Sequence, residues 1–199
     1  MPDYFPAFLD LRGRRCLVVG GGPVAERKVL DLLACGADVV VVSPALALTL
    51  SKLVAERVVR HRCRTFRGSD VRSCMVVVAA TGRPDVDDAV VTAARRHRAL
   101  LNVVDRPALC EFIFPSVLRR GELQIAVSTG GRSPALAREI RRRLETMFGP
   151  EYAELVERVG AARARARAGA DTLAARLDAG ERVVAAAFES DTAVDSFTL

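Results

Sequence analysis

The glycine-rich turn Gly20-Gly21-Gly22-Pro23-Val24-Ala25 is the first segment whose residue types and spacing indicate chemistry. It follows an apolar run and matches G-x-G-x-x-A, a pattern typical of dinucleotide-binding turns between a strand and a helix. Gly20 allows the tight turn, and Gly22 carries no side chain where a pyrophosphate must approach backbone N–H groups. The alternative is a tight turn without a ligand. We expect the cofactor-binding residues here to be Gly20, Gly22, Pro23 and Val24.

The next predicted strand ends at Val42-Ser43-Pro44-Ala45, where this fingerprint normally has an acid that binds the ribose hydroxyls. That acid is missing, although the Ser43 hydroxyl can form a weaker hydrogen bond to a ribose. No lysine or arginine occurs between Ser43 and Lys52, so a cation for the 2′-phosphate of NADP is missing too. We therefore expect NAD as the cofactor, bound in part by Ser43, Pro44 and Ala45.

Two later predicted strands also end in polar residues. Thr81 follows one of them, and Asn102 and Asp105 lie at the end of the next. Ligands of open α/β sheets bind at this carboxyl edge, so we expect Thr81 to contact the cofactor and Asn102 to contact the substrate. Arg106 follows Asp105 directly, so an ion pair with a nearby arginine is the alternative role for this carboxylate.

A second polar loop, Ser128-Thr129-Gly130-Gly131-Arg132-Ser133-Pro134, precedes a predicted helix. Successive backbone N–H groups and the positive end of a helix favour an anion. The alternative is a capped turn between strand and helix, for which one glycine would suffice. We expect the substrate-binding residues of this loop to be Ser128, Thr129, Gly130, Gly131 and Arg132.

The elements that must position these residues alternate between strands and helices. Short apolar runs predict strands at 16–20, 39–42, 57–66, 74–80 and 100–105. Helical periodicity predicts helices at 24–35, 45–56 and 84–97. This alternation indicates a parallel sheet with right-handed crossovers, which is a Rossmann-type, doubly wound α/β domain over about residues 12–110.

The pattern changes after this domain. We expect a β-hairpin from strands at 112–118 and 123–128, then an amphipathic helix from Ser133-Pro134 to about Phe148. Helical stretches at 151–168 and 171–188 follow, and residues 189–199 show no periodicity. We therefore divide the chain into an NAD-binding Rossmann domain (1–111), a dimerisation and substrate region (112–149) and a helical C-terminal region (150–199).

Composition excludes several classes of protein. Half of the 199 residues are hydrophobic, which argues against disorder, and no apolar run is long enough for a membrane helix. The five cysteines are scattered and the two histidines lack ligand-spaced partners, so we expect no disulfide framework and no metal site. The N-terminus lacks the layout of a signal peptide, and we expect a soluble, cytoplasmic protein.

The charge is uneven, with a net +9 over residues 1–150 and −3 over residues 151–199. A basic body predicts an anionic partner. Nucleic acid is disfavoured, because the chain has no tryptophan and only two tyrosines to stack on bases.

In combination these motifs resemble the family of precorrin-2 dehydrogenases, which also form the N-terminal module of siroheme synthases. The resemblance covers about residues 5–150 and rests on the leader ending Phe8-Leu9-Asp10-Leu11, the run Cys16–Lys28, Ala79-Ala80-Thr81, Asn102-Val103-Val104-Asp105, Phe112-Ile113-Phe114-Pro115-Ser116 and Val127–Pro134. It implies the NAD-dependent oxidation of precorrin-2 to sirohydrochlorin, on the way to siroheme or a cobalamin, in a homodimer. It also implies that Asp105 is the catalytic acid or base. Precorrin-2 is a polycarboxylate, so arginines should orient it, with Arg132, Arg119, Arg120 and Arg138 as candidates.

Two alternatives stay open. The protein could also insert Fe²⁺ or Co²⁺ into sirohydrochlorin, with Asp105 taking a proton from the macrocycle. It could instead be a non-catalytic NAD-sensing module, which would bind the cofactor but no tetrapyrrole. Residues 112–168 are too few for an independent core, so their apolar faces should pack against a second copy of the chain.

Overall fold

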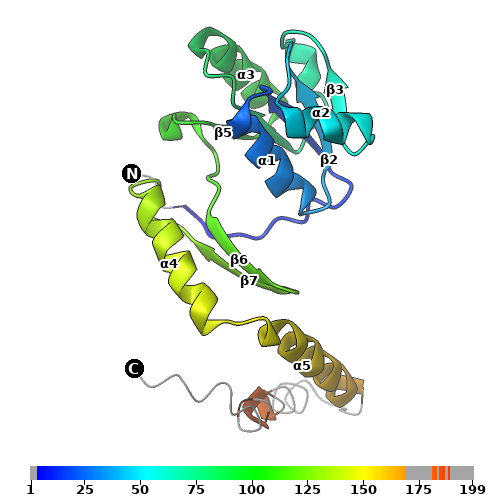
Figure 1. The fold of residues 1–199 in the computed structure, drawn as a ribbon, viewed down its shortest axis with the longest axis vertical. Coiled ribbons are helices and arrows are strands. Elements are labelled where there is room, and N and C mark those ends of the chain that lie inside the picture. Colours follow the sequence, from blue (N-terminus) through cyan, green and yellow to red (C-terminus); the bar gives the residue numbers. More distant parts are fainter. Residues whose placement is uncertain (1–3, 169–180, 183, 187, 189–199) are drawn as a thin grey trace. The chain divides into compact units, whose positions relative to one another are not determined.

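The computed structural model describes residues 4–168, 181–182, 184–186 and 188 (Figure 1). Met1–Phe114 and Pro115–Leu199 form two compact units. The strands of the first unit are β1 (Arg15–Val19), β2 (Asp38–Val42), β3 (Arg60–Arg62), β4 (Val76–Ala79) and β5 (Leu100–Val103). Its α-helices are α1 (Pro23–Leu33), α2 (Leu48–Ala55) and α3 (Pro84–His97), with 3-10 turns at Gly68–Val71 and Pro107–Leu109.

The five strands form one parallel sheet in the order β3-β2-β1-β4-β5. The chain builds outward from β1 through β2 to β3, and then crosses to β4 and β5 on the other side. The direction of winding therefore reverses between β1 and β4. In sheets of this kind, ligands bind in the crevice at the carboxyl ends of the two strands that flank the reversal. The Rossmann-type fold predicted from the alternating pattern is confirmed.

The strands are apolar on both faces because helices cover both sides of the sheet. Residues alternate between the two sides, so Leu17 packs in the cluster that contains α3 and Val18 in the cluster that contains α1 and α2. Both side chains are fully buried. The two clusters hold the carboxyl ends of β1 and β4 in place from both faces.

In the first unit, β3 and α2 are shortened most relative to their predicted bounds. The strand predicted at 57–66 forms only over Arg60–Arg62, because the end of α2 uses the preceding residues: Arg57 N donates to Val54 O (3.0 Å) and Val58 N to Leu53 O (2.9 Å). The helix predicted from Ala45 begins at Leu48. Ala47, just before the observed helix, has an extended backbone instead, and its N–H donates to Gly21 O (2.7 Å).

The second unit contains an antiparallel hairpin of β6 (Ser116–Arg120) and β7 (Leu123–Val127), followed by α4 (Pro134–Met147) and α5 (Glu151–Ala168). The strand predicted from Phe112 starts only at Ser116, because Pro115 has no N–H for a ladder and Phe112 packs in the core of the first unit. Ser133 caps α4 as predicted, with its hydroxyl accepting from Leu136 N (3.2 Å).

The helix predicted at 171–188 lies for the most part outside the described residues, as does the segment 189–199. Among the described residues, no helix is both long and apolar enough to cross a membrane.

Candidate functional site

The first two glycines of the turn after β1 are required by the fold. Gly20 has φ +124°, and a Cβ there would clash with the carbonyl oxygen of Ala80, just after the neighbouring strand β4. A Cβ on Gly21 would clash with the carbonyl oxygen of Ala45. These two glycines therefore bring the ends of β1, β2 and β4 close together at the carboxyl edge of the sheet.

Gly22 differs from both. Its φ of −84° suits any residue, and nothing lies within 4 Å of the position that a Cβ would take. Neither the backbone nor the packing of the described protein requires a glycine at this position. The open space above it is what a dinucleotide needs in order to approach the backbone closely.

The start of α1 beside Gly22 has no side-chain cap. Pro23 occupies the first turn, and the first backbone bond runs from Glu26 N to Gly22 O (3.0 Å). The N–H groups of Val24 and Ala25 have no partner within the helix for that reason. Free N–H groups and the positive end of the helix dipole make this an anion-binding end that fits a pyrophosphate.

Ser43, which we expected to contact a ribose, is buried at the end of β2. Its hydroxyl donates to Ala45 O (2.7 Å), and its carbonyl lies 2.9 Å from Nε2 of His61. The hydroxyl proton therefore holds the turn 43–45, and the same oxygen accepts from Ala45 N (3.4 Å). A direct contact between Ser43 and the cofactor stays a prediction.

The arginines that the sheet brings next to the end of β2 are held by one buried acid, Asp70. Arg64 donates to both of its carboxylate oxygens, at 2.6 and 2.8 Å, and Arg62 pairs with it as well. Burial opposes the charge, but the hydrogen bonds from Arg64, from Arg67 N and from Arg62 outweigh it and lower the pKa of Asp70 to about 2. The sequence signal for this cluster is a single acid among several arginines.

The hydroxyl of Thr81, which follows β4, stabilises the turn before α3. It accepts from Arg83 N (3.0 Å) and donates to Oδ1 of Asp87 (2.7 Å) on α3. Asp87 was not among the predicted site residues, although a signal was available. It lies at helical spacing from the buried Val90, Val91 and Ala94, so a charged residue stands on an apolar stripe.

Asn102 on β5 is buried, and its amide donates to Phe112 O (3.0 Å). This bond holds the segment after β5 against the strand. It uses one of the two amide N–H donors, and the predicted contact of Asn102 with the substrate stays a prediction.

Asp105 is exposed and takes the left-handed conformation (φ +58°) just after β5. The alternative of an ion pair with Arg106 is wrong, because Arg106 donates to Oδ1 of Asp88 on α3 instead (2.6 Å). In the described part of the chain, no group pairs with the Asp105 carboxylate or donates a hydrogen bond to it. This carboxylate is therefore available to a ligand.

The loop 128–132 belongs to the second unit. Gly130 N donates to the hydroxyl of Ser128 (3.1 Å) and Ser133 N to the hydroxyl of Thr129 (3.0 Å). Both hydroxyls accept in these bonds, so their protons can be donated outward. Arg132 is exposed and has no ion-pair partner among the described residues. This donor-rich loop suits a carboxylate ligand.

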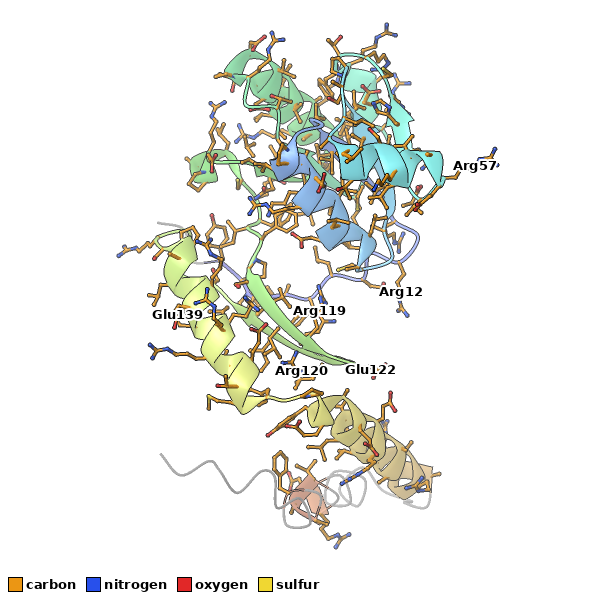
Figure 2. All side chains as sticks on the ribbon, in the orientation of Figure 1. Arg12, Arg57, Arg119, Arg120, Glu122 and Glu139 are labelled. Carbon is orange, nitrogen blue, oxygen red and sulfur yellow. The ribbon has the colours of Figure 1, made fainter. Side chains whose placement is uncertain are left out.

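The other arginines expected to meet a polyanion differ in their surroundings (Figure 2). Arg120 on β6 donates to the carbonyl of Phe148 (2.9 Å), which links the hairpin to the end of α4. Arg119 donates to the side chain of Gln124 across the hairpin (2.6 Å). Arg138 on α4 is exposed and has no ion pair with any described residue. Arg132 and Arg138 are therefore the better candidates for a substrate contact.

Within the described residues, no group of three or more His, Cys, Asp or Glu side chains is arranged to hold a metal ion.

Comparisons with known proteins agree with this arrangement. Residues 7–116 match a family model described as putative NAD(P)-binding, and residues 120–147 match one described as sirohaem biosynthesis protein central. Siroheme synthase of Methylococcus capsulatus is 43% identical over 165 residues, which are 83% of this chain and 35% of that protein. Siroheme synthase of Thioalkalivibrio sulfidiphilus is 45% identical over 83% of this chain and 34% of its own length.

The chain thus spans about a third of the length of these curated relatives. A solved structure named "SirC, precorrin-2 dehydrogenase" superposes with a TM-score of 0.78, covering 96% of this chain and 94% of the other. Its sequence identity is 22%, so this likeness shows the fold.

Proposed function

The chain belongs to the family described as putative NAD(P)-binding, and on that premise we propose that it oxidises precorrin-2 to sirohydrochlorin with a nicotinamide cofactor. The proposal of a nicotinamide cofactor rests on Gly22. A glycine that the fold does not require stands at an uncapped helix start, beside the reversal point of the sheet. The substrate part rests on the relatives, on the donor-rich loop 128–132 and on the free carboxylate of Asp105.

NAD⁺ rather than NADP⁺ is the cofactor that this site favours. The turn 43–45 contains no cation, and the arginines nearest to it in the sheet are held by Asp70. A 2′-phosphate would need such a cation. The acid that usually binds the ribose is also missing, so we propose a moderate preference rather than an absolute one.

The residues of this chain have separate tasks in the proposed reaction. The N–H groups of Val24 and Ala25 would hold the pyrophosphate, and Gly22 leaves room for it. When bound, the cofactor supplies hydride acceptance. Asp105 accepts the proton that leaves the substrate with the hydride, because its carboxylate is exposed and has no partner among the described residues. Arg132 and the hydroxyls of Ser128 and Thr129 would orient the substrate carboxylates.

We also propose a homodimer formed through the second unit. Leu136, Ile140 and Met147 on α4 are exposed large apolar side chains, and their spacing of four and seven residues places them along one side of the helix. Burying such a surface would favour the pairing of two copies.

Anaerobic incubation with precorrin-2 and NAD⁺ tests the proposed activity. Sirohydrochlorin should form only when the protein, the substrate and the cofactor are all present. Adding Fe²⁺ or Co²⁺ afterwards tests chelation separately. A protein that binds NAD⁺ but leaves precorrin-2 unchanged would instead fit the non-catalytic alternative.

A further inference from the structure

The carboxylate of Asp87 is a buried group at the carboxyl edge of the sheet to which the proposed reaction gives no task. The residue is 5% exposed and lies on α3 among the buried side chains that cover β4. Its Oδ1 accepts from the hydroxyl of Thr81 at 2.7 Å. Among the described residues, none donates to the other oxygen, Oδ2.

Oδ2 is not among the buried side-chain atoms of the described residues that lack a partner, so it reaches the surface, where a ligand can contact it. Bracing Thr81 requires only one acceptor oxygen, which a neutral amide would supply. The Thr81 hydroxyl is already anchored on its other side by Arg83 N. The fold therefore does not require the second carboxylate oxygen of Asp87. In the same way, it does not require a glycine at position 22.

The position of Asp87 relative to the strands indicates what would meet Oδ2. In folds of this type the pyrophosphate lies at the start of the helix after β1, and the adenosine ribose lies toward the end of β2. Thr81 follows β4 and donates to the Asp87 side chain, and β4 borders β1 on the side opposite to β2. A dinucleotide that runs from β2 across β1 would place its nicotinamide half toward β4.

We propose that Asp87 is a cofactor-binding residue whose Oδ2 accepts a hydrogen bond from a hydroxyl or amide N–H in the nicotinamide half of the dinucleotide, while Thr81 holds Oδ1 in place. This inference rests on the proposed dinucleotide site. It adds a carboxylate contact in a chain whose usual ribose-binding acid at the end of β2 is missing.

The Asp87→Asn variant tests the proposal by calorimetric titration with NAD⁺ and with ADP, which has no nicotinamide half. The amide keeps an oxygen for Thr81 and places a donor where Oδ2 was, facing the donor of the ligand. The Kd for NAD⁺ should rise at least tenfold, which corresponds to about 1.4 kcal/mol. The Kd for ADP should stay unchanged. Asp85→Asn is the matched control, because Asp85 lies two residues away, is exposed and pairs with Arg83; it should change neither Kd.

An unchanged Kd for NAD⁺ in Asp87→Asn would reduce the residue to a brace for Thr81, and an equal loss for NAD⁺ and ADP would overturn its assignment to the nicotinamide half. If Asp87→Asn does not fold, Thr81→Val removes the donor to Oδ1 and is titrated in the same way. Weaker NAD⁺ binding with normal ADP binding supports the proposal, and unchanged binding of both contradicts it. Wild-type protein that binds neither ligand would contradict the dinucleotide site itself.

Discussion

Replacing Asp105 by Asn should lower turnover without changing the stability of the fold. The wild-type residue has φ +58°, a left-handed conformation that Asn and Asp adopt readily and that costs Ala about 1–2 kcal/mol. Its exposed carboxylate has no partner among the described residues, so its loss breaks no contact there. We expect the free energy of unfolding of Asp105→Asn to stay within about 0.5 kcal/mol of wild type. Turnover should fall roughly 10²–10⁴-fold, the usual contribution of a general acid or base.

The assay pairs kcat for precorrin-2 oxidation with the melting temperature, measured on one preparation of each variant. Asp105→Ala should lose the same activity and also some stability, because alanine disfavours the left-handed conformation. NAD⁺ affinity should barely change in either variant, since the pyrophosphate site lies at Gly22, at the end of a different strand. Full turnover in Asp105→Asn would refute the proposed role of this carboxylate. Dehydrogenation that survives while metal insertion fails would reassign it to chelation.

The remaining predictions concern the cofactor, the buried acid and the dimer. Gly22→Val should abolish NAD⁺ binding by calorimetry and leave the melting temperature nearly unchanged, because its Cβ meets nothing in the protein; normal affinity would show that the turn is only structural. Steady-state kinetics should give a higher kcat/KM with NAD⁺ than with NADP⁺, and the opposite order would contradict the reasoning from residues 43–45. The folded-state pKa of Asp70 is lowered from 3.8 to about 2, so the stability that its charge provides is present above 3.8 and lost as the pH falls toward 2. That loss should be about 2 kcal/mol and absent in Asp70→Asn, as followed by melting at a series of pH values. Light scattering at micromolar concentration should give a dimer for wild type and a monomer for Ile140→Glu, and a wild-type monomer would overturn the proposed dimer.

Local patterns were enough to predict most of the fold. The helix predicted at 84–97 has the same bounds in the structure, because Pro84 suits a first helical turn and Arg98 ends the helix in a left-handed conformation. Short apolar runs correctly indicated the strands of the sheet, and the glycine pattern correctly indicated the tight turn between β1 and α1. These features depend on neighbours along the chain, which a sequence shows directly.

The parts that could not be predicted depend on contacts between distant residues. Arg106 follows Asp105 in sequence, but it pairs with Asp88, which only the packing of α3 brings within reach. The buried position of Asn102 likewise follows from its bond to Phe112 O, ten residues away. The role of Asp87 could have been suspected from a charge on an apolar stripe, but its bond to Thr81 required the structure.

The most direct test of the proposed oxidation is to measure both products in one anaerobic reaction. With precorrin-2 and NAD⁺, the wild-type protein should form NADH and sirohydrochlorin in equal amounts, and Gly22→Val should form neither. NADH formation without sirohydrochlorin, or no reaction by wild-type protein that demonstrably binds NAD⁺, would contradict the proposal that this chain is a precorrin-2 dehydrogenase.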